Sequence, residues 1–372
     1  MLNSKGSNMS KVQPLLREIT IGDLTLKNRM VMAPMTRSRA NNPEYRPTEL
    51  QAKYYEQRSS AGLIITCGSQ VSKDAVGYIN TPGIYSEVQV DGWKLVTDAV
   101  HKREGKIFIQ LWHVGRMSHP DFHNGEPPLA PSAINPKSKS FTYEGFQDTV
   151  TPRAMTIADI KQTIQDFKNG ASNAMKAGFD GVEIHSSNGY LFHQFFTGCS
   201  NNRTDEYGGS IENRARFLFE VIDAIKGVMP ENRIGARLNP SFHDIFGITI
   251  DEKTIPTFEY IVEKLNNYNL AYLHLSEPFN DVTNVPFAEL KIAKHFRPLY
   301  KGCLMINNKF NQEKGNRVLK ENLADLVAFG RLFISNPDLP KRFELSGDIT
   351  RYDKNTFYTP GEKGYTDYPL LP

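Results

Sequence analysis

The sequence has few cysteines and no long apolar run. Cys67, Cys199 and Cys303 are the only cysteines among the 372 residues, and no two of them have the C-x-x-C spacing. A zinc knuckle, iron–sulfur ligation and a disulfide framework are therefore not expected. No apolar stretch approaches the ~18 residues that cross a bilayer, and Met1–Met9 lacks the apolar core of a secretory signal. We expect a cytoplasmic protein with no membrane partner.

An excess of charge of one sign is also missing. Lysine and arginine together number 44 and aspartate and glutamate 41, so the formal net charge of +3 gives no reason to expect a nucleic-acid partner. Apolar residues make up 39% of the chain, which excludes a disordered, collagen-like or coiled-coil protein. The length suggests two or three domains of about 150 residues each, although a single α/β barrel with insertions also reaches it.

Short apolar runs alternate with amphipathic helical stretches along most of the chain. The runs are Arg29–Pro34, Leu63–Thr66, Ile107–Trp112, Gly181–His185, Ile234–Leu238, Tyr272–Leu275, Cys303–Ile306 and Leu326–Phe329. Such runs are typical of strands that are buried on both faces, as in a parallel sheet covered by helices. Strand followed by helix eight times predicts a (β/α)8 TIM barrel, with a doubly wound sheet as the weaker alternative.

Two of the expected helices have clear ends. Thr156 and Asp159 have the spacing of a capping box, and Gly178 provides a C-terminal stop, so a helix is predicted between them. Ser210 similarly opens a helix that ends near Gly227.

Two segments fall outside the repeat. Glu18–Lys27 alternates apolar and polar residues around Gly-Asp, which predicts a β-hairpin before the first barrel strand. Residues 114–152 are rich in Pro, Ser, Asn and Gly and follow the third strand. A loop of that length is usually functional, and in a barrel it would lie over the carboxyl-terminal face, where active sites are built. We therefore predict a flexible extension over residues 1–14 and one barrel over residues 15–372, with residues 114–152 as an active-site cap.

The residues that follow the strands are polar and aromatic rather than acidic. A hydrolytic metal site needs clustered His, Asp and Glu ligands, and only His113 and His185 keep a metal interpretation open. After the eighth strand, Gly330 and Arg331 stand where barrels often bind phosphate. The alternative for Arg331 is an ion pair with a neighbouring carboxylate.

Six segments resemble the Old Yellow Enzyme family, in the family's order from about Leu15 to the C-terminus. They are Ala33–Arg37, Gln110–Arg116, Gly181–Tyr190, Asn202–Arg214, Ala328–Asp338 and Gly364–Pro369. The sequence is similar to the bacterial N-ethylmaleimide and nitrate-ester reductases and the plant 12-oxophytodienoate reductases. The resemblance implies an ene-reductase that holds FMN non-covalently and uses NADPH or NADH to reduce activated alkenes, among them enones, maleimides and nitro compounds. The absence of a G-x-G-x-x-G fingerprint is consistent, because the nicotinamide binds over the flavin in this family.

The resemblance also implies which residues contact FMN: Pro34, Thr36, Gly68, Gln110, Arg237, Asn308, Gly330 and Arg331. In these roles Thr36 tunes the ring near N5, Gln110 satisfies the pyrimidine edge, and Arg237 places a positive charge near N1. Arg331 takes the phosphate. Asn308 and Lys309 replace a glycine-containing pair of many relatives, so the backbone donors there are left open.

For the substrate, the resemblance implies that His185 and Asn188 donate hydrogen bonds to the carbonyl oxygen while Tyr190 protonates the α-carbon. Trp112 and Tyr358 are expected to shape the substrate pocket. Two other functions remain open: a metal-dependent barrel hydrolase using His113 and His185, and a barrel that binds ligands without turnover. The physiological substrate, the preference between NADPH and NADH, and the choice between monomer and homodimer are not determined by these residues.

Overall fold

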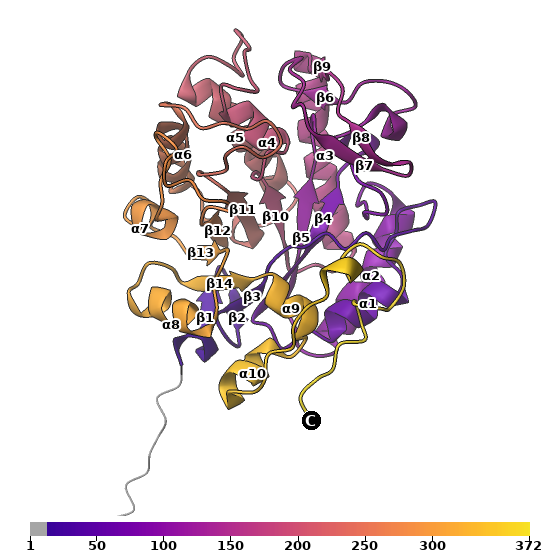
Figure 1. The fold of residues 1–372 in the computed structure, drawn as a ribbon, viewed down its shortest axis with the longest axis vertical. Coiled ribbons are helices and arrows are strands. Elements are labelled where there is room, and N and C mark those ends of the chain that lie inside the picture. The colour runs from indigo at the N-terminus through magenta and orange to yellow at the C-terminus, as the bar shows by residue number, and fades with distance from the viewer. Residues whose placement is uncertain (1–12) are drawn as a thin grey trace, which may run out of the picture.

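The structure is a computed structural model that describes residues 13–372, and its centre is a closed barrel of eight parallel strands (Figure 1). The strands are β3 (Met30–Met32), β4 (Leu63–Gln70), β5 (Ile107–Trp112), β10 (Gly181–His185), β11 (Ile234–Leu238), β12 (Tyr272–Ser276), β13 (Leu304–Asn307) and β14 (Leu326–Phe329). They pair in chain order, and β14 closes the barrel against β3. Each strand contains or overlaps one of the eight predicted runs, so the (β/α)8 prediction is confirmed.

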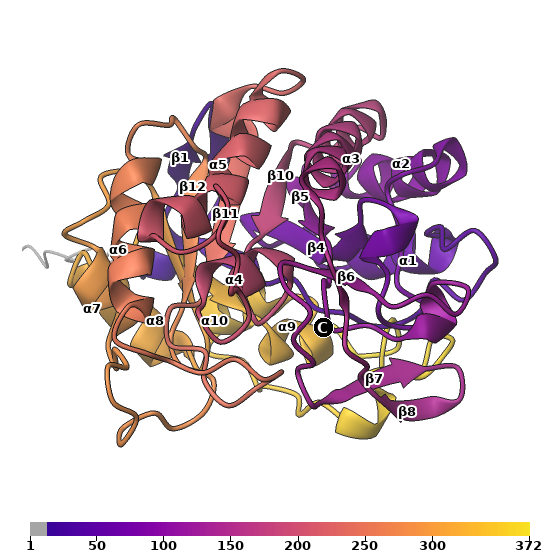
Figure 2. The same ribbon diagram turned by 90° about the horizontal axis from the view of Figure 1, so that it is seen from above.

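Helices lie around the outside of the barrel (Figures 1 and 2). They are α1 (Glu49–Glu56), α2 (Glu87–His101), α3 (Ile157–Lys176), α4 (Leu191–Phe196), α5 (Ile211–Lys226), α6 (Thr254–Leu265), α7 (Ile292–Phe296), α8 (Gln312–Lys320), α9 (Arg331–Ser335) and α10 (Leu339–Leu345). Within residues 13–372, no helix has the length and apolarity needed to cross a bilayer.

The sequence sets the ends of α3 directly. The Thr156 hydroxyl accepts a hydrogen bond from the Asp159 backbone N–H (3.1 Å), and the Asp159 carboxylate accepts one from the Thr156 N–H (2.7 Å). Gly178 has a φ of +83°, the left-handed conformation that ends a helix and that glycine adopts at least cost. Both predicted ends are therefore confirmed.

The predicted hairpin lies at the amino-terminal end of the barrel. Strands β1 (Ile19–Ile21) and β2 (Leu24–Leu26) are antiparallel, and their buried side chains join the apolar cluster inside the barrel. Asp23 in the turn forms an ion pair with Arg233, which directly precedes β11 (2.5 Å). The hairpin thus closes the end of the barrel opposite the carboxyl ends of the strands. Gln13 donates to the Phe343 carbonyl (3.1 Å) and Pro14 begins a short 3-10 helix, whereas residues 1–12 of the predicted extension lie outside the described residues.

The long excursion after β5 contains short strands and one 3-10 turn. Its strands are β6 (Leu129–Ala130), β7 (Lys139–Thr142) and β8 (Gly145–Asp148), and its 3-10 turn is Pro120–Phe122. Strand β9 (Arg153–Ala154) directly follows the excursion and pairs with β6. Strands β7 and β8 form an antiparallel hairpin, and Phe141 forms a β-bridge with Tyr78, in the loop after β4.

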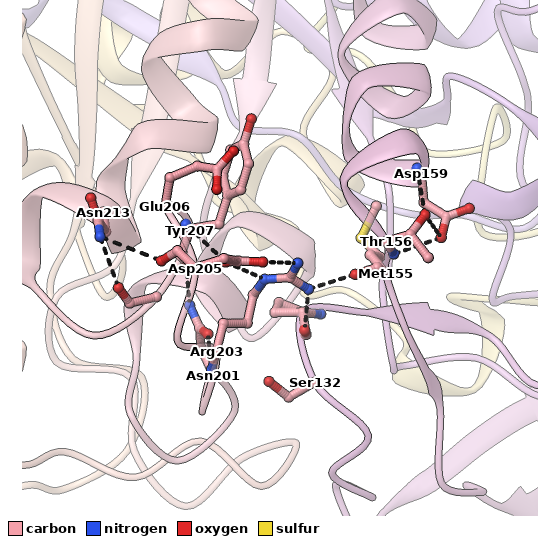
Figure 3. A network of polar contacts seen from close by, with 12 residues as sticks. Ser132, Met155, Thr156, Asp159, Asn201, Arg203, Asp205, Glu206, Tyr207 and Asn213 are labelled. Atoms are coloured by element: carbon pink, nitrogen blue, oxygen red, sulfur yellow. Dashed lines mark hydrogen bonds and ion pairs between the residues drawn. The ribbon is translucent and has the colours of Figure 1, made fainter.

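Arg203 links the middle of this excursion to the residues that directly follow it (Figure 3). Its Nη1 donates to the carbonyl oxygens of Pro131 (2.8 Å) and Met155 (2.6 Å), while Asp205 pairs with its Nε and Nη2. The backbone N–H of Asn202 donates to the Ser132 hydroxyl (3.0 Å). The Asn202–Arg214 segment resembles a motif of the family, but its sequence indicates no role. In the structure its residues Asn202 and Arg203 anchor the excursion to the barrel.

Candidate active site

A small cavity at the carboxyl ends of the strands collects most of the predicted site residues. Its volume is about 120 Å³, and its lining consists of Pro34, Thr36, Gly68, Gln110, Trp112, His185, Asn188, Tyr190 and Arg237. These residues come from five barrel strands and the loops that follow them. Every residue of this lining was predicted from the sequence, as a contact of the flavin or of the substrate.

A second cavity of about 410 Å³ shares Pro34 with the first, and its lining includes Asn308, Lys309, Gly330 and Arg331. The guanidinium of Arg331 lies 5.9 Å from the centre of the Tyr352 ring, and within residues 13–372 it forms no ion pair with a carboxylate. The alternative interpretation of Arg331 as part of an ion pair is therefore wrong. A cation that no carboxylate neutralises fits the phosphate end of FMN.

Asn308 and Lys309, which line the second cavity and replace a glycine-containing pair of many relatives, have a backbone conformation that glycine favours. Asn308 has a φ of +83° and Lys309 a φ of +58°. Both therefore adopt the left-handed region that glycine favours in a turn. The Asn308 side-chain amide donates to the carbonyl oxygens of Glu277 (3.0 Å) and Pro278 (2.7 Å). Because these bonds occupy the amide, Lys309 and Arg331 are the charged groups that this turn and α9 offer to a phosphate.

Gly68 and Gly330, one in each cavity lining, have different surroundings. A Cβ at Gly68 would lie 2.6 Å from the Trp112 ring, so only glycine lets β4 and this indole approach. A Cβ at Gly330 would touch only the Met35 sulfur, at 3.6 Å, and would otherwise project into open space. Gly68 is therefore required by packing of the protein itself, whereas packing alone does not explain Gly330.

His185 is a neutral donor in this site. Burial, with the charge of Arg237 as a smaller cause, holds the pKa of His185 well below its ordinary value. Its Nδ1 lies 3.1 Å from the Ser187 hydroxyl. When Ser187 donates to Nδ1, the ring hydrogen sits on Nε2 and serves as a donor to a ligand.

Asn188 is oriented by a neighbouring amide. It has a φ of +57°, and its Oδ1 accepts a hydrogen bond from Asn239 Nδ2 (3.0 Å). This contact leaves the Asn188 amide nitrogen as a donor. The site thus presents two uncharged donors, His185 and Asn188, on one cavity wall.

Tyr190 is fixed by aromatic packing and one hydrogen bond. Its ring packs edge-on against Trp112 and His185, with centroid distances of 5.0 Å in both pairs. Its hydroxyl donates to the Tyr78 hydroxyl (3.2 Å). Burial, reinforced by Tyr78, raises the pKa of Tyr190 well above its ordinary value, so the phenol keeps its proton at neutral pH. Sequence reasoning missed Tyr78, a single tyrosine in a loop with no motif around it.

The residues around the smaller cavity include buried polar atoms that need a partner. Gln110 Nε2 donates to a buried carboxylate, Glu183 (2.7 Å). Arg237 is buried, and its Nε has no hydrogen-bond partner among residues 13–372; the same holds for Nε1 of Trp112. Buried donors without an acceptor are costly. A planar ligand rich in carbonyl and ring-nitrogen acceptors would satisfy them, so these residues fit FMN.

Two predicted residues lie outside both cavities. The Tyr358 side chain is 57% exposed and packs edge-on against Phe357, so a contact with substrate stays a prediction. His113 accepts a hydrogen bond at Nδ1 from the Gly115 N–H (3.0 Å), and burial lowers its pKa to about 3. In the part of the chain that the structure describes, no group of three or more His, Cys, Asp or Glu is placed to hold a metal ion.

Comparisons with known proteins agree with this geometry. The model of the NADH:flavin oxidoreductase / NADH oxidase family matches residues 14–347. 12-Oxophytodienoate reductase 1 of Oryza sativa subsp. japonica is 42% identical over 369 residues, which are 96% of this chain and 93% of that protein. Among solved structures, morphinone reductase has a TM-score of 0.91 and 43% identity and covers 96% of each chain. The old yellow enzyme homologue from Zymomonas mobilis also has a TM-score of 0.91, at 39% identity over 96% of this chain and 99% of its own.

These similarities extend over nearly the whole chain, and they decide between the three functions that the sequence left open. A family of flavin oxidoreductases accounts for the cavity, whereas neither a metal-dependent hydrolase nor a barrel without turnover does. The protein is an NAD(P)H-dependent flavin oxidoreductase with FMN as its cofactor, and the chain belongs to the NADH:flavin oxidoreductase / NADH oxidase family, the Old Yellow Enzyme family.

Proposed function

We propose that this chain reduces the C=C bond of α,β-unsaturated carbonyl compounds and related activated alkenes, including maleimides and nitroalkenes. The observation that carries the proposal is the wall formed by His185, Asn188 and Tyr190 in one cavity with the predicted flavin contacts Gln110 and Arg237. A bound FMN, held at its ring by Gln110 and Arg237, would supply the hydride chemistry between NADPH or NADH and the alkene. The remaining chemistry belongs to side chains of the protein.

His185 and Asn188 bind the carbonyl oxygen of the alkene. Each is a neutral donor, and each is held by a second polar group, Ser187 for the imidazole and Asn239 for the amide. Negative charge develops on that oxygen during hydride addition, so oriented donors stabilise the transition state more than the ground state. Loss of one such donor costs on the order of 10²–10³ in rate.

Tyr190 supplies the proton to the α-carbon. A general acid must be protonated at the working pH, and burial raises the pKa of this phenol. The contact with Tyr78 supports the role, because a second hydroxyl at 3.2 Å is placed to return a proton to Tyr190 after transfer. Tyr78 is itself half-buried.

FMN is held without a covalent bond in this proposal. Gln110 and Arg237 would contact the ring, Thr36 would tune it, and Arg331 with Lys309 would bind the phosphate. We further propose that residues 15–372 form one FMN-binding unit with residues 114–152 as its cap, that Trp112 and Tyr358 shape the pocket, and that the protein is a cytoplasmic monomer or homodimer.

One experiment tests the proposal as a whole. The purified protein is denatured by heat, and the supernatant is analysed by mass spectrometry for free FMN at one per chain. NADPH oxidation is then followed without and with cyclohexenone, and the product is identified by gas chromatography. We expect FMN in the supernatant and cyclohexanone as the product. FAD in place of FMN, or NADPH consumption without alkene reduction, would contradict it.

A further inference from the structure

A buried carboxylate lies one layer below the small cavity. Glu183 is on β10, two residues before His185, and residues two apart on a strand point to the same face. The side chain of Glu183 is completely buried and lines neither of the two cavities. Barrel closure pairs it in register with Gln110 of β5. The mechanism proposed above gives this carboxylate no role.

Glu183 joins three strands through its two oxygen atoms. Oε1 accepts a hydrogen bond from Gln110 Nε2 (2.7 Å), and Oε2 lies 2.8 Å from Nδ1 of His274 on β12. His274 is also completely buried, and its Nε2 has no partner among residues 13–372. A buried charge is costly unless it is paired and hydrogen-bonded. Two donors to one carboxylate, from strands on either side, reduce that cost.

The other titratable groups around Glu183 are one cation and two groups that stay uncharged. Burial lowers the pKa of His274 and outweighs the opposing effect of Glu183, so this imidazole is neutral at pH 7. Burial also raises the pKa of Tyr272 well above its ordinary value, which keeps that phenol neutral. Burial lowers the pKa of the Arg237 guanidinium while Glu183 raises it. Arg237 is therefore the cation that interacts with the Glu183 carboxyl group.

We propose that Glu183 is a positioning residue for the flavin site: it holds the Gln110 amide in one orientation and offsets the charge of Arg237, and in this way it sets the reduction potential of FMN. The proposal rests on the proposed function, in which Gln110 and Arg237 contact the ring. With Nε2 committed to Glu183, the Gln110 carbonyl oxygen is the acceptor that it offers to an N–H of the ring. If the Gln110 amide were flipped, its carbonyl oxygen would face the Glu183 carboxylate, and two hydrogen-bond acceptors would lie against each other.

The charge of Glu183 and the orientation of the Gln110 amide have separate consequences for the cofactor. Reduction of FMN adds negative charge to the ring, so a carboxylate nearby disfavours the reduced form. Glu183→Gln keeps the size of the side chain and removes the charge, and it leaves Arg237 without its counter-charge. We expect the midpoint potential to rise. A tenfold change in the preference for reduced over oxidised cofactor equals about 30 mV for a two-electron couple, and a rise of at least that size is expected.

Three further variants separate charge from shape. Glu183→Asp keeps the charge but shortens the reach to Gln110, so FMN should bind to the apoprotein several-fold more weakly while the potential of the bound cofactor stays near that of the wild type. His274→Gln keeps a neutral N–H donor, so it should leave the potential unchanged. Glu220→Gln is the matched control, because Glu220 bonds to Tyr207 and Lys161 outside the barrel.

The potentials are measured by dye equilibration on the holoproteins, FMN affinities by fluorescence titration of the apoproteins, and folding by circular dichroism. A Glu183→Gln holoprotein with the wild-type potential would overturn the proposal. If Glu183→Gln does not fold, wild-type FMN affinity in Glu183→Asp, or a shift of its potential, would overturn it. A wild-type protein that binds no FMN, or whose FMN affinity and reduction do not respond to Arg237→Ala, would instead count against the proposed function.

Discussion

Substitution of Tyr190 by phenylalanine isolates the proton-transfer step. The ring is held by Trp112, His185 and Phe246, with centroid distances of 5.0, 5.0 and 5.8 Å. Phenylalanine keeps these contacts and removes only the hydroxyl. The structural cost is one hydrogen bond between neutral groups, to Tyr78, worth about 0.5–1.5 kcal/mol. The variant should therefore fold as the wild type does.

The kinetic cost should be larger and confined to one half-reaction. A positioned general acid contributes about 10²–10⁴ in rate, which equals roughly 2.7–5.4 kcal/mol of activation free energy at ~1.36 kcal/mol per tenfold. Oxidation of the reduced enzyme by a simple enone should slow by that factor. Reduction by NADPH needs no proton from Tyr190 and should stay within about twofold of the wild type. A nitroalkene should lose less, because its nitronate is stable enough to leave before it is protonated.

Stopped-flow absorbance measures the two half-reactions separately, and Tyr260→Phe is the matched control. Tyr260 lies on α6, outside the barrel, where its ring packs edge-on against Phe219. The control should change neither rate. If Tyr190→Phe slowed only the NADPH half-reaction, or if it left enone reduction at the wild-type rate, the assignment of Tyr190 as the acid would be refuted.

The other predictions concern the remaining parts of the site. His185→Ala should weaken the binding of enones and phenols and slow enone reduction about 10²–10³-fold; normal phenol binding in a spectroscopic titration would contradict this role. Arg237→Ala should lower FMN content or slow reduction of the cofactor, and unchanged values of both by absorbance and stopped flow would argue against its place beside the ring. The enone half-reaction should be independent of pH between about 6 and 9, because the pKa of His185 lies below its ordinary ~6.5 and that of Tyr190 above ~10; loss of rate as the pH falls through 6.5 would show that His185 is protonated there. Arg203→Lys replaces a fork of donors by one ammonium group, so limited proteolysis should cut residues 114–152 faster than in the wild type. The control is Arg216→Lys, at a half-buried arginine of α5 that donates to the Glu206 carbonyl, and equal cleavage rates in the wild type and Arg203→Lys would remove Arg203 as the anchor of the excursion.

Local patterns in the sequence are sufficient to predict the barrel. Runs such as Gly181–His185 and Ile234–Leu238 are apolar enough to be buried on both faces, and caps such as Thr156 with Asp159 mark the helices between them. These signals are local: they depend on residues within one strand or one helical turn of each other. Since all strands of the barrel are parallel, their carboxyl ends meet at one face, and the residues that follow them must lie together. That rule, with the family resemblance, was sufficient to predict the complete lining of the small cavity.

The side chains that orient the predicted site residues come from distant parts of the chain and could not be identified from the sequence. Tyr78 meets Tyr190 across 112 positions of the chain, and Gln110 meets Glu183 across 73. Arg203 reaches Pro131 across 72 positions to hold the excursion in place. Such contacts depend on the register in which the barrel closes and on the path of the loops above it. A shift of register by one residue would turn each strand side chain to the other face. No pattern within a single element encodes that register, because it is set by the packing of all eight strands together.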